Sequence, residues 1–367
     1  MLNRIAVLGL GFGDEGKGRV VDYLCTKTEN PVVIRFSGGP QAAHHVMLDN
    51  ETSHVFAHFG SGTLRGVKTI WSEYCPVNPI SMWNEHDVLK KLGYQPKIAI
   101  HGKCPIITPY EIAWNYNDKP VIEHGSCGMG IFATKLREEA NWSILFEDLY
   151  HPEVFQIKID NLWRFYYQFL ASYQREEIEV LYEACQWIRK NSNIELYYDS
   201  DQQCLSKNTI FEGSQGLLLD QNHGFFPHVT PSNTGLDNIN EGIDEVWLVT
   251  RAYQTRHGAG PMSPIVEHKI DINPYEKNGN NGIQGEFRRT ILDLDMIRYA
   301  LQKHQLIRHK HKTLVITCMD LLNNYQLFDN GKIINCSLGE FINKIQEATE
   351  TEKVYLSWSP IGDLDKI

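Results

Sequence analysis

A glycine-rich segment directly after a short apolar run constrains this 367-residue chain more than any other feature. The run Ile5–Leu8 is followed by GFGDEGKG, which starts at Gly11 and leads into an expected helix over Gly18–Cys25. A strand, a glycine loop and a helix together form a cradle for phosphate groups, because main-chain N–H groups at the start of a helix attract anions. We therefore expect the chain to bind a nucleotide through this loop.

The loop fits two known phosphate-binding patterns only in part. Its glycines have the G-x-G-x-x-G spacing of dinucleotide folds, but no acidic residue follows the second expected strand, where RFSGG begins at Arg35. The stretch Gly11–Lys17 also reads G-x-x-x-x-G-K, yet Gly18 stands where a Walker loop has the Ser or Thr that holds magnesium. A plain tight turn is disfavoured, because four glycines and a lysine fall within eight positions.

An aspartate inside an anion-binding loop is unexpected unless its carboxylate takes part in the chemistry. Ionised Asp14 can accept a proton from a substrate or bind Mg²⁺ beside the phosphates. A second polar segment, RFSGGPQAAHHV, places Gln41, His44 and His45 after a glycine pair at the end of an expected strand. On this pattern alone, a catalytic and a structural role for the two histidines are equally favoured.

Bulk properties exclude several classes of protein. The net charge of −10 disfavours a general nucleic-acid binder or a membrane-surface protein. Apolar residues make up 42% and charged residues 22%, so we expect a folded chain, with residues 1–367 in one domain. The eight cysteines contain no C-x-x-C pair, which is typical of reduced thiols in a cytoplasmic protein. We find neither a signal peptide nor an apolar stretch long enough to span a membrane.

The apolar runs predict an α/β fold, in which a large, mostly parallel central sheet is flanked by helices and a P-loop-like glycine loop follows the first strand. The stretch 155–190 predicts a pair of helices, and the Asn/Gly-rich segment 276–286 predicts a mobile loop. Seven strands are expected: Ile5–Leu8, Val32–Phe36, Ile98–Ile100, Ile210–Phe211, Val246–Val249, Leu314–Thr317 and Val354–Leu356.

Together, these motifs resemble those of the adenylosuccinate synthetase family. FGDEGKGR is close to the family's W-G-D-E-G-K-G-K, and RFSGGPQAAH resembles R-x-x-G-G-x-N-A-G-H. FEGSQGLLLDQNHGFFPHVTPSNT, from Phe211, is similar to a third, specific signature, and SGTLR, CPII, TRHGAGP and TCMD occur in the family's order. The resemblance covers essentially the whole chain. A few tens of residues common in bacterial members are absent between Asp320 and Ser357, as in short archaeal and phage forms.

The resemblance implies a GTP-dependent ligase that joins L-aspartate to IMP, giving adenylosuccinate, GDP and phosphate. It implies that Asp14 removes the N1 proton of IMP so that O6 attacks the γ-phosphate, and that His44 stabilises the developing charge. The amine of aspartate then displaces the 6-phosphoryl group. Lys17 and the loop amides would hold the GTP phosphates. The implied cofactor is Mg²⁺, bound by Asp14 and the main-chain carbonyl of Ala43.

The implied binding residues form three groups, and the family also implies a homodimer. The GTP group is Gly13, Glu15, Gly16, Lys17, Gly18, His45, Arg288, Asp320, Ser357 and Ser359; the IMP group is Asp14, Gln41, Cys127, Gln215 and Thr230; the aspartate group is Arg288 and Arg289.

Several positions depart from the family pattern. Gln41 replaces an asparagine, and Cys127 replaces a phosphate-binding threonine with a poorer hydrogen-bond partner. Asn141 stands where the family has an arginine that reaches across the dimer, although Arg137 lies one helical turn away. Cys318 replaces the lysine that normally lies along the guanine base.

The segment GIQGEFRRT departs most, because the family has T-T-G-R-x-R-R there. Glu286 takes the position of the arginine that binds aspartate, so Arg288 or Arg289 must take that role, or the amine donor differs. The fold also serves phage enzymes that make 2-aminoadenine from dGMP, in which a small residue typically replaces the loop aspartate. Retained Asp14 makes that our second hypothesis, and a non-catalytic nucleotide-binding relative is our third.

Overall fold

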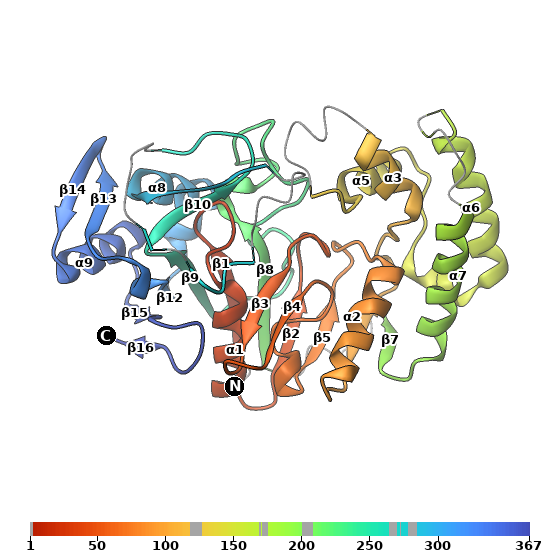
Figure 1. Cartoon of the computed structure of the whole chain (residues 1–367), viewed down its shortest axis with the longest axis horizontal. Coiled ribbons are helices and arrows are strands. Elements are labelled where there is room, and N and C mark those ends of the chain that lie inside the picture. The colour runs from red at the N-terminus through yellow and green to blue at the C-terminus, as the bar shows by residue number, and fades with distance from the viewer. Residues whose placement is uncertain are drawn as a thin grey trace.

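The computed structural model describes residues 3–117, 127–168, 170, 175–199, 208–263, 270–271, 273–277 and 285–367. Its central sheet contains ten strands (Figure 1): β1 (Arg4–Gly9), β2 (Val32–Arg35), β5 (Lys68–Trp71), β6 (Ile98–His101), β7 (Ile194–Tyr197), β8 (Thr209–Gly216), β9 (Glu245–Arg251), β12 (Lys312–Thr317), β15 (Lys353–Leu356) and β16 (Asp365–Lys366). Their order is β16-β15-β12-β9-β1-β8-β2-β5-β6-β7. All neighbours are parallel except β16, which is antiparallel to β15.

Two smaller sheets and the helices surround this central sheet. A four-stranded sheet has the order β10 (Tyr253–His257), β11 (Phe287–Asp293), β13 (Tyr325–Asp329), β14 (Lys332–Cys336), and a hairpin joins β3 (His44–Met47) to β4 (Ser53–Phe56). The described α-helices are α1 (Lys17–Lys27), α2 (Pro79–Lys91), α3 (Pro109–Asn117), α5 (Ile131–Glu139), α6 (Pro152–Tyr166), α7 (Arg175–Lys190), α8 (Leu294–Lys303) and α9 (Leu338–Thr349). In Figure 1, α6 and α7 lie at one end of the molecule and the β13–β14 hairpin lies at the other.

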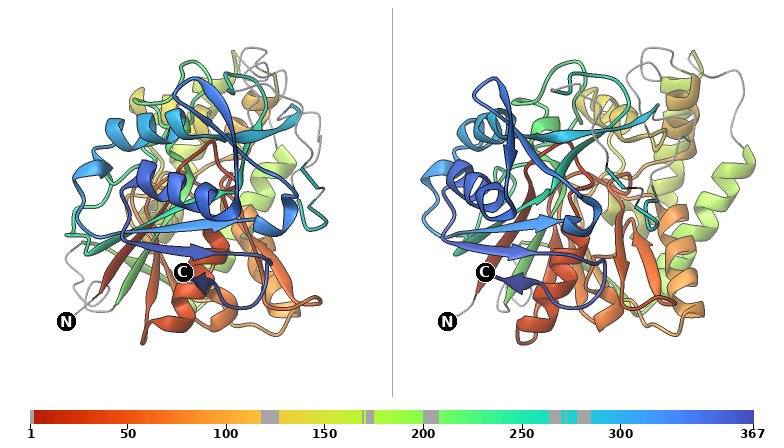
Figure 2. Two further views of the ribbon diagram at one scale, coloured as in Figure 1. Left: turned by 90° about the vertical axis from the view of Figure 1, so that its left-hand side faces the viewer. Right: turned by 60° about the vertical axis from the view of Figure 1, so that its left-hand side comes forward.

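The strand β1 is buried on both faces, as expected for a central parallel strand. Ile5 and Val7 share one core cluster with residues of α1, whereas Ala6 and Leu8 share another with residues of α8 and α9. Figure 2 brings the C-terminal elements α9, β15 and β16 toward the viewer, at the edge of the same sheet. Burial on both sides fixes β1 and therefore also fixes the start of the glycine loop that follows it.

The predicted fold class is confirmed, and each of the seven expected strands matches a strand of the central sheet, although the expected Val32–Phe36 extends one residue beyond β2. The expected helix pair is confirmed by α6 and α7. The sequence did not predict β5, β7, the β3–β4 hairpin or the four-stranded sheet. The segment 276–286, expected to be mobile, lies mostly outside the described residues. No helix in the described part of the chain combines the length and apolar character that crossing a membrane requires.

Strand order decides which loops meet. Parallel strands end at the same edge of a sheet, so the loops after these strands converge there. The loops after β12 and β15 lie on one side of the β1 loop, and the loops after β8 and β2 lie on its other side. The glycine loop therefore stands in the middle of the converging segments.

Candidate active site

The glycine loop is organised from inside by a glutamate. One oxygen of the Glu15 carboxylate accepts hydrogen bonds from the main-chain N–H groups of Gly11 (3.0 Å) and Gly13 (2.8 Å). Its other oxygen accepts one from Lys17 Nζ at 2.6 Å. Gly16 begins α1 with a φ of 94°, a left-handed conformation that favours glycine. The loop therefore has a fixed shape, and the charge of buried Lys17 is balanced by Glu15.

Position 18, where a Walker loop has a hydroxyl-bearing residue, must be glycine for a steric reason. A Cβ on Gly18 would lie 2.7 Å from the Cβ of His44 and 2.9 Å from Ser61 Oγ. Real Cβ atoms essentially never approach that closely. The first turn of α1 thus has a glycine because the strand β3, which carries His44, packs directly against it.

Two neighbouring strands hold the loop from one side. Arg251, at the end of β9, donates a hydrogen bond to the main-chain carbonyl of Asp14. Thr317, at the end of β12, donates its hydroxyl to the carbonyl of Glu15 at 2.7 Å. Asp14 itself has a left-handed φ of 62°, which aspartate tolerates better than most residues. These contacts keep the half-buried Asp14 side chain at the wall of a cavity.

The surroundings of Asp14 strengthen it as a base. Burial raises the pKa of its carboxyl group, and the nearby carboxylates of Glu276 and Glu15 act in the same direction. The positive charge of Arg251 opposes this rise in pKa, and Arg251 is itself paired with Glu276 at 2.8 Å. A carboxylate with a raised pKa accepts a proton more readily than an ordinary aspartate.

A buried carboxylate orients His44. His44 Nδ1 lies 2.5 Å from Glu212 Oε1, and His44 Nε2 lies 3.1 Å from the carbonyl oxygen of Ser214. Although burial favours its neutral form, hydrogen bonds from His44 and Ser61 and the positive charge of Arg35 lower the pKa of Glu212 to about 2. Burial lowers the pKa of His44, while the Glu212 carboxylate favours the charged ring. Since both ring nitrogens face acceptors, both hydrogen bonds form together only in the imidazolium.

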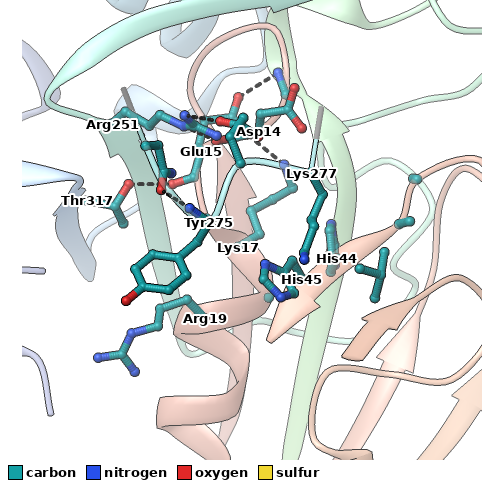
Figure 3. Close-up of a pocket in the computed structure, with 18 of the residues that line it drawn as sticks. Asp14, Glu15, Lys17, Arg19, His44, His45, Arg251, Tyr275, Lys277 and Thr317 are labelled. Atoms are coloured by element: carbon teal, nitrogen blue, oxygen red, sulfur yellow. Dashed lines mark hydrogen bonds and ion pairs between the residues drawn. The ribbon is translucent and has the colours of Figure 1, made fainter. Parts of the chain in front are cut away.

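A cavity of about 530 Å³ joins these groups. Figure 3 shows Asp14, Lys17, His44 and His45 around it. Of the residues proposed from the sequence, it is lined by Gly13, Asp14, Glu15, Gly16, Lys17, Gly18, Gln41, Ala43, His44, His45, Cys127, Gln215, Asp320, Ser357 and Ser359. The structure thus brings together residues from six separate segments of the chain.

The cavity extends to both sides of the glycine loop. Asp320 and Ser357, which follow β12 and β15, line it on one side, and Gln41 and Gln215 line it on the other. Two ligands can therefore meet at Asp14, each held by its own set of loops. The cavity volume of about 530 Å³ lies within the range of about 300–1,000 Å³ that is common for small-molecule sites.

Several polar atoms on the cavity wall have no protein partner among the described residues. The side-chain oxygen and nitrogen of Gln41, the oxygen of Gln215 and His45 Nε2 are buried and make no hydrogen bond. Both ring nitrogens of His257 are also buried and make no hydrogen bond with the described residues. A buried polar group without a partner costs about 1–3 kcal/mol, so these atoms are expected to bind a polar ligand.

Three proposed binding residues do not line this cavity. Thr230 is buried behind it and donates its main-chain N–H to the carbonyl of Leu219 at 2.7 Å. Arg288 donates to the carbonyls of Gly258 (2.6 Å) and Gly260 (3.0 Å). Arg289 is exposed and donates to the carbonyl of Asp271 at 3.3 Å.

Arg137, considered as a replacement for an arginine that crosses a dimer interface, is fully buried within this chain. Its guanidinium pairs with Glu111 at 2.8 Å and donates to the carbonyl of Ile106 at 2.6 Å. This residue therefore packs inside its own chain and does not reach outward.

Sequence reasoning missed several residues of the site. Arg251 and Glu212 lie at or near the ends of apolar strands, and a charged residue at the end of a buried strand was the available signal. Tyr275, Glu276 and Lys277 also line the cavity, and Lys277 contributes positive charge next to His45 (Figure 3).

A proton acceptor inside a phosphate-binding loop suits the transfer of a phosphoryl group from a nucleotide to an atom that must lose a proton. The fold and the site therefore define a nucleotide-dependent phosphoryl-transfer enzyme. The chain belongs to the adenylosuccinate synthetase family, because the model of that family, "Adenylosuccinate synthetase", matches residues 6–355. It is an adenylosuccinate synthetase-type ligase, of a GTP-binding family in purine biosynthesis.

Known members of the family support this membership along most of the chain. It is 31% identical to adenylosuccinate synthetase of Psychromonas ingrahamii over 337 residues, which is 83% of this chain and 76% of the relative. It is 28% identical to the Thermoplasma acidophilum enzyme over 322 residues, covering 81% and 72%.

Solved structures agree on the fold. Fully ligated adenylosuccinate synthetase from Plasmodium falciparum has a TM-score of 0.76 at 18% identity, and each chain is covered to 98%. The cyanophage S-2L succinoaminodeoxyadenylate synthetase PurZ, bound to dGMP and dATP as an energy donor, has a TM-score of 0.71 at 15% identity, covering 100% of this chain and 95% of that one. At these identities the likeness concerns the fold alone.

Proposed function

We propose that this ligase joins L-aspartate to IMP at the expense of GTP, forming adenylosuccinate through a 6-phosphoryl intermediate. The observation that carries this proposal is Asp14, a carboxylate with a raised pKa at the centre of a cavity that extends to both sides of the phosphate-binding loop. One side of the cavity takes GTP and the other takes the purine nucleotide. The phosphates of GTP then meet the purine edge at Asp14.

Each step follows from a group on the cavity wall. Asp14 takes the proton from N1 of the purine, which makes O6 a better nucleophile. Lys17 and the loop amides hold the GTP phosphates. Because these groups donate hydrogen bonds to Glu15 in the structure, some of those hydrogen bonds must be replaced by hydrogen bonds to phosphate oxygens when GTP binds. His44, held by Glu212, faces the charge that develops during transfer. Transfer of the γ-phosphoryl group to O6 releases GDP. The amine of aspartate then attacks C6, and the C6–O6 bond breaks to release inorganic phosphate.

The cofactor we propose is Mg²⁺. Asp14 and exposed Ala43 both line the cavity, and a carboxylate and a main-chain carbonyl are oxygen donors that suit a hard dication. When bound, Mg²⁺ supplies positive charge that offsets the phosphates. These two groups are the ligands that the chain itself offers.

The choice of IMP rests on the retained loop aspartate. An acceptor of the N1 proton is needed when O6 must become a nucleophile, and Asp14 supplies it. The second hypothesis, dGMP as substrate, is favoured by the fold-level likeness to PurZ. We rank it lower, because the resemblance implies that phage enzymes of that branch typically have a small residue in place of the loop aspartate, which makes room for the purine 2-amino group, whereas this chain retains Asp14.

The amine donor is proposed to be aspartate, held by Arg288 or Arg289. Both arginines lie on β11, and Arg288 binds carbonyls of the loop that follows His257 on the cavity wall. A guanidinium suits a dicarboxylate because it makes paired hydrogen bonds. We also propose that the enzyme works as a homodimer in the cytoplasm.

Phosphate release tests this function. We expect turnover with GTP, IMP and aspartate together, loss of adenylosuccinate formation when any one is omitted, and little turnover with GMP or dGMP. Product mass measured by mass spectrometry identifies the purine and the amine. Turnover that requires dGMP would favour the second hypothesis. If aspartate supports no turnover with any of IMP, dIMP, GMP and dGMP, another amine donor must be sought.

Asp320 is expected to select GTP over ATP. Its exposed carboxylate lines the cavity after β12, where it can accept from N1–H and N2–H₂ of guanine together. Adenine presents a lone pair at N1 and would leave the carboxylate unpaired. The variant D320N should lower kcat/KM for GTP by about 10–100-fold, the equivalent of roughly 1–3 kcal/mol, and narrow the preference over ATP.

The matched control for Asp320 is D363N. Asp363 is an exposed carboxylate in the segment after β15 that does not line the cavity. Its variant should keep the GTP preference of the wild type. A wild-type enzyme that prefers ATP, or a D320N enzyme with unchanged preference, would contradict the role assigned to Asp320.

A further inference from the structure

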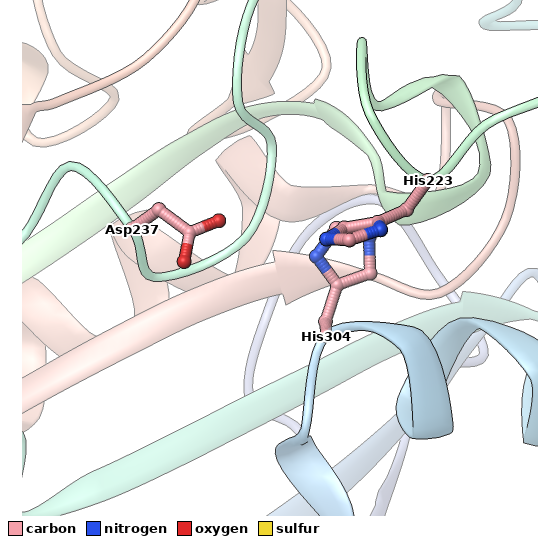
Figure 4. A group of neighbouring side chains, drawn as sticks. All are labelled: His223, Asp237 and His304. Carbon is pink, nitrogen blue, oxygen red and sulfur yellow. The ribbon is translucent and has the colours of Figure 1, made fainter.

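Three side chains that commonly bind metals meet outside the cavity. His223, Asp237 and His304 each present one ligand atom, and these atoms all lie within 4.8 Å of one another (Figure 4). His223 and Asp237 come from the segment between β8 and β9, and His304 is the residue at the C-terminal end of α8. None of the three lines the active-site cavity, so this cluster is separate from the proposed Mg²⁺ site.

The hydrogen bond made by His304 shows which of its ring nitrogens carries the proton and which has a lone pair. Nε2 lies 3.1 Å from the carbonyl oxygen of Leu217, which can only accept, so Nε2 carries the proton. Nδ1 therefore holds a lone pair, and it is buried with no hydrogen-bond partner among the described residues. A backbone carbonyl on the second nitrogen is the usual support for a metal-binding histidine.

A glycine packs close to that nitrogen. A Cβ at Gly235 would lie 2.4 Å from His304 Nδ1, so a larger residue there would clash with the imidazole ring. The rings of His223 and His304 are nearly perpendicular, at 80°, with centroids 4.9 Å apart. Two imidazoles can point nitrogens at one ion in this arrangement without clashing.

The loop that carries His223 is itself held in place. Buried Asp220 accepts the N–H groups of His223 (3.1 Å) and Thr234 (2.7 Å), which ties together the two halves of the segment. The hydroxyl of Tyr299, on α8, donates to the carbonyl of His223 at 3.1 Å. The ligand positions therefore depend on buried hydrogen bonds and not on exposed side chains alone.

We propose that His223, Asp237 and His304 form a site for a transition-metal dication of the Zn²⁺ class, completed by water. Two histidines and one carboxylate are a ligand set that Zn²⁺ accepts. Ligand atoms around tetrahedral zinc lie about 3.3 Å apart, given bonds of about 2.0–2.1 Å, so atoms that lie up to 4.8 Å apart must move closer when the ion binds. Exposed Asp237 can supply that movement by rotating its side chain. The bound ion ties the segment that contains Thr230 to α8.

Zinc titration of the whole chain tests the site, with Mg²⁺ in excess so that the Asp14 site does not take up the probe. We expect one equivalent of Zn²⁺ to bind and to raise Tm, because a ligand that binds only the folded state stabilises it. Co²⁺ should give the visible absorption of a low-symmetry site with nitrogen ligands. The variants H304Q and D237N should each weaken Zn²⁺ binding by at least about 10–100-fold.

Two comparisons keep the result interpretable. H311Q removes an exposed histidine directly before β12, outside the cluster, and should bind Zn²⁺ like the wild type. D237N changes an exposed side chain, so it tests the site even if H304Q fails to fold. The proposal is wrong if the wild type binds Zn²⁺ no more tightly than about 100 µM, or if D237N and H304Q bind it as well as H311Q does.

Discussion

The variant D14N is expected to lose at least about 10²–10⁴-fold in kcat while remaining folded and able to bind GTP. The asparagine amide has nearly the shape of the carboxylate but cannot accept the N1 proton of the purine. The loop itself should survive, because its hydrogen bonds involve the main-chain carbonyl of Asp14 and the side chain of Glu15. Single-turnover phosphate release, Tm and GTP affinity together separate a lost base from a lost fold.

The pH dependence gives an independent check on Asp14. Its pKa is raised in the folded protein, so the reactive carboxylate is lost as the pH falls through a value above that of an ordinary aspartate. The acid limb of the kcat/KM profile should therefore lie at a higher pH than an ordinary aspartate gives, and it should disappear in D14N. D160N is the matched control, because it makes the same Asp-to-Asn change at an exposed residue of α6. It should behave like the wild type. Near-normal turnover in D14N would exclude Asp14 as the base.

The sequence predicted the central sheet well because parallel strands buried on both faces have continuous apolar runs. The strands that it missed have polar or mixed compositions. KTIW in β5 and IELY in β7 each mix apolar residues with one charged residue, and HHVM in β3 was interpreted only as a pair of candidate site histidines. These segments become strands because neighbouring strands supply hydrogen bonds, which no local pattern records.

The candidate site was predictable where residues stand in loops after strands, and less so where they lie inside the fold. Asp14, His44 and Gln215 belong to local motifs, and all three line one cavity. Glu212 was read as part of a family motif, and its hydrogen bond to His44, 168 positions away in the chain, required the structure. Arg251 and Glu276 form an ion pair beside Asp14 that no spacing predicts.

His44 rather than His45 is expected to support catalysis. His44 is buried against Glu212 and held at both ring nitrogens, whereas His45 is half-buried and has an unpaired Nε2 on the cavity wall. H44A should therefore lower kcat by about 10²–10³-fold, the loss typical when one group that stabilises transition-state charge is removed. H45A should mainly raise the KM for the nucleotide, since a group that binds ground and transition states equally affects binding alone.

A substitution at Glu212 can distinguish its two effects on His44, which are to orient the ring and to favour the charged imidazolium. E212Q keeps a hydrogen-bond acceptor near His44 Nδ1 but removes the negative charge that favours the imidazolium. Because the pKa of Glu212 is about 2, the carboxylate is ionised throughout the working pH range, and E212Q should shift the pH profile of kcat as well as lower it. H44A and the double variant should then show similar kcat values, since Glu212 acts through His44. If H45A lost kcat while H44A kept a normal kcat, His45 and not His44 would be the catalytic histidine. If the pH profile of kcat were unchanged in E212Q, the role of Glu212 would be structural only.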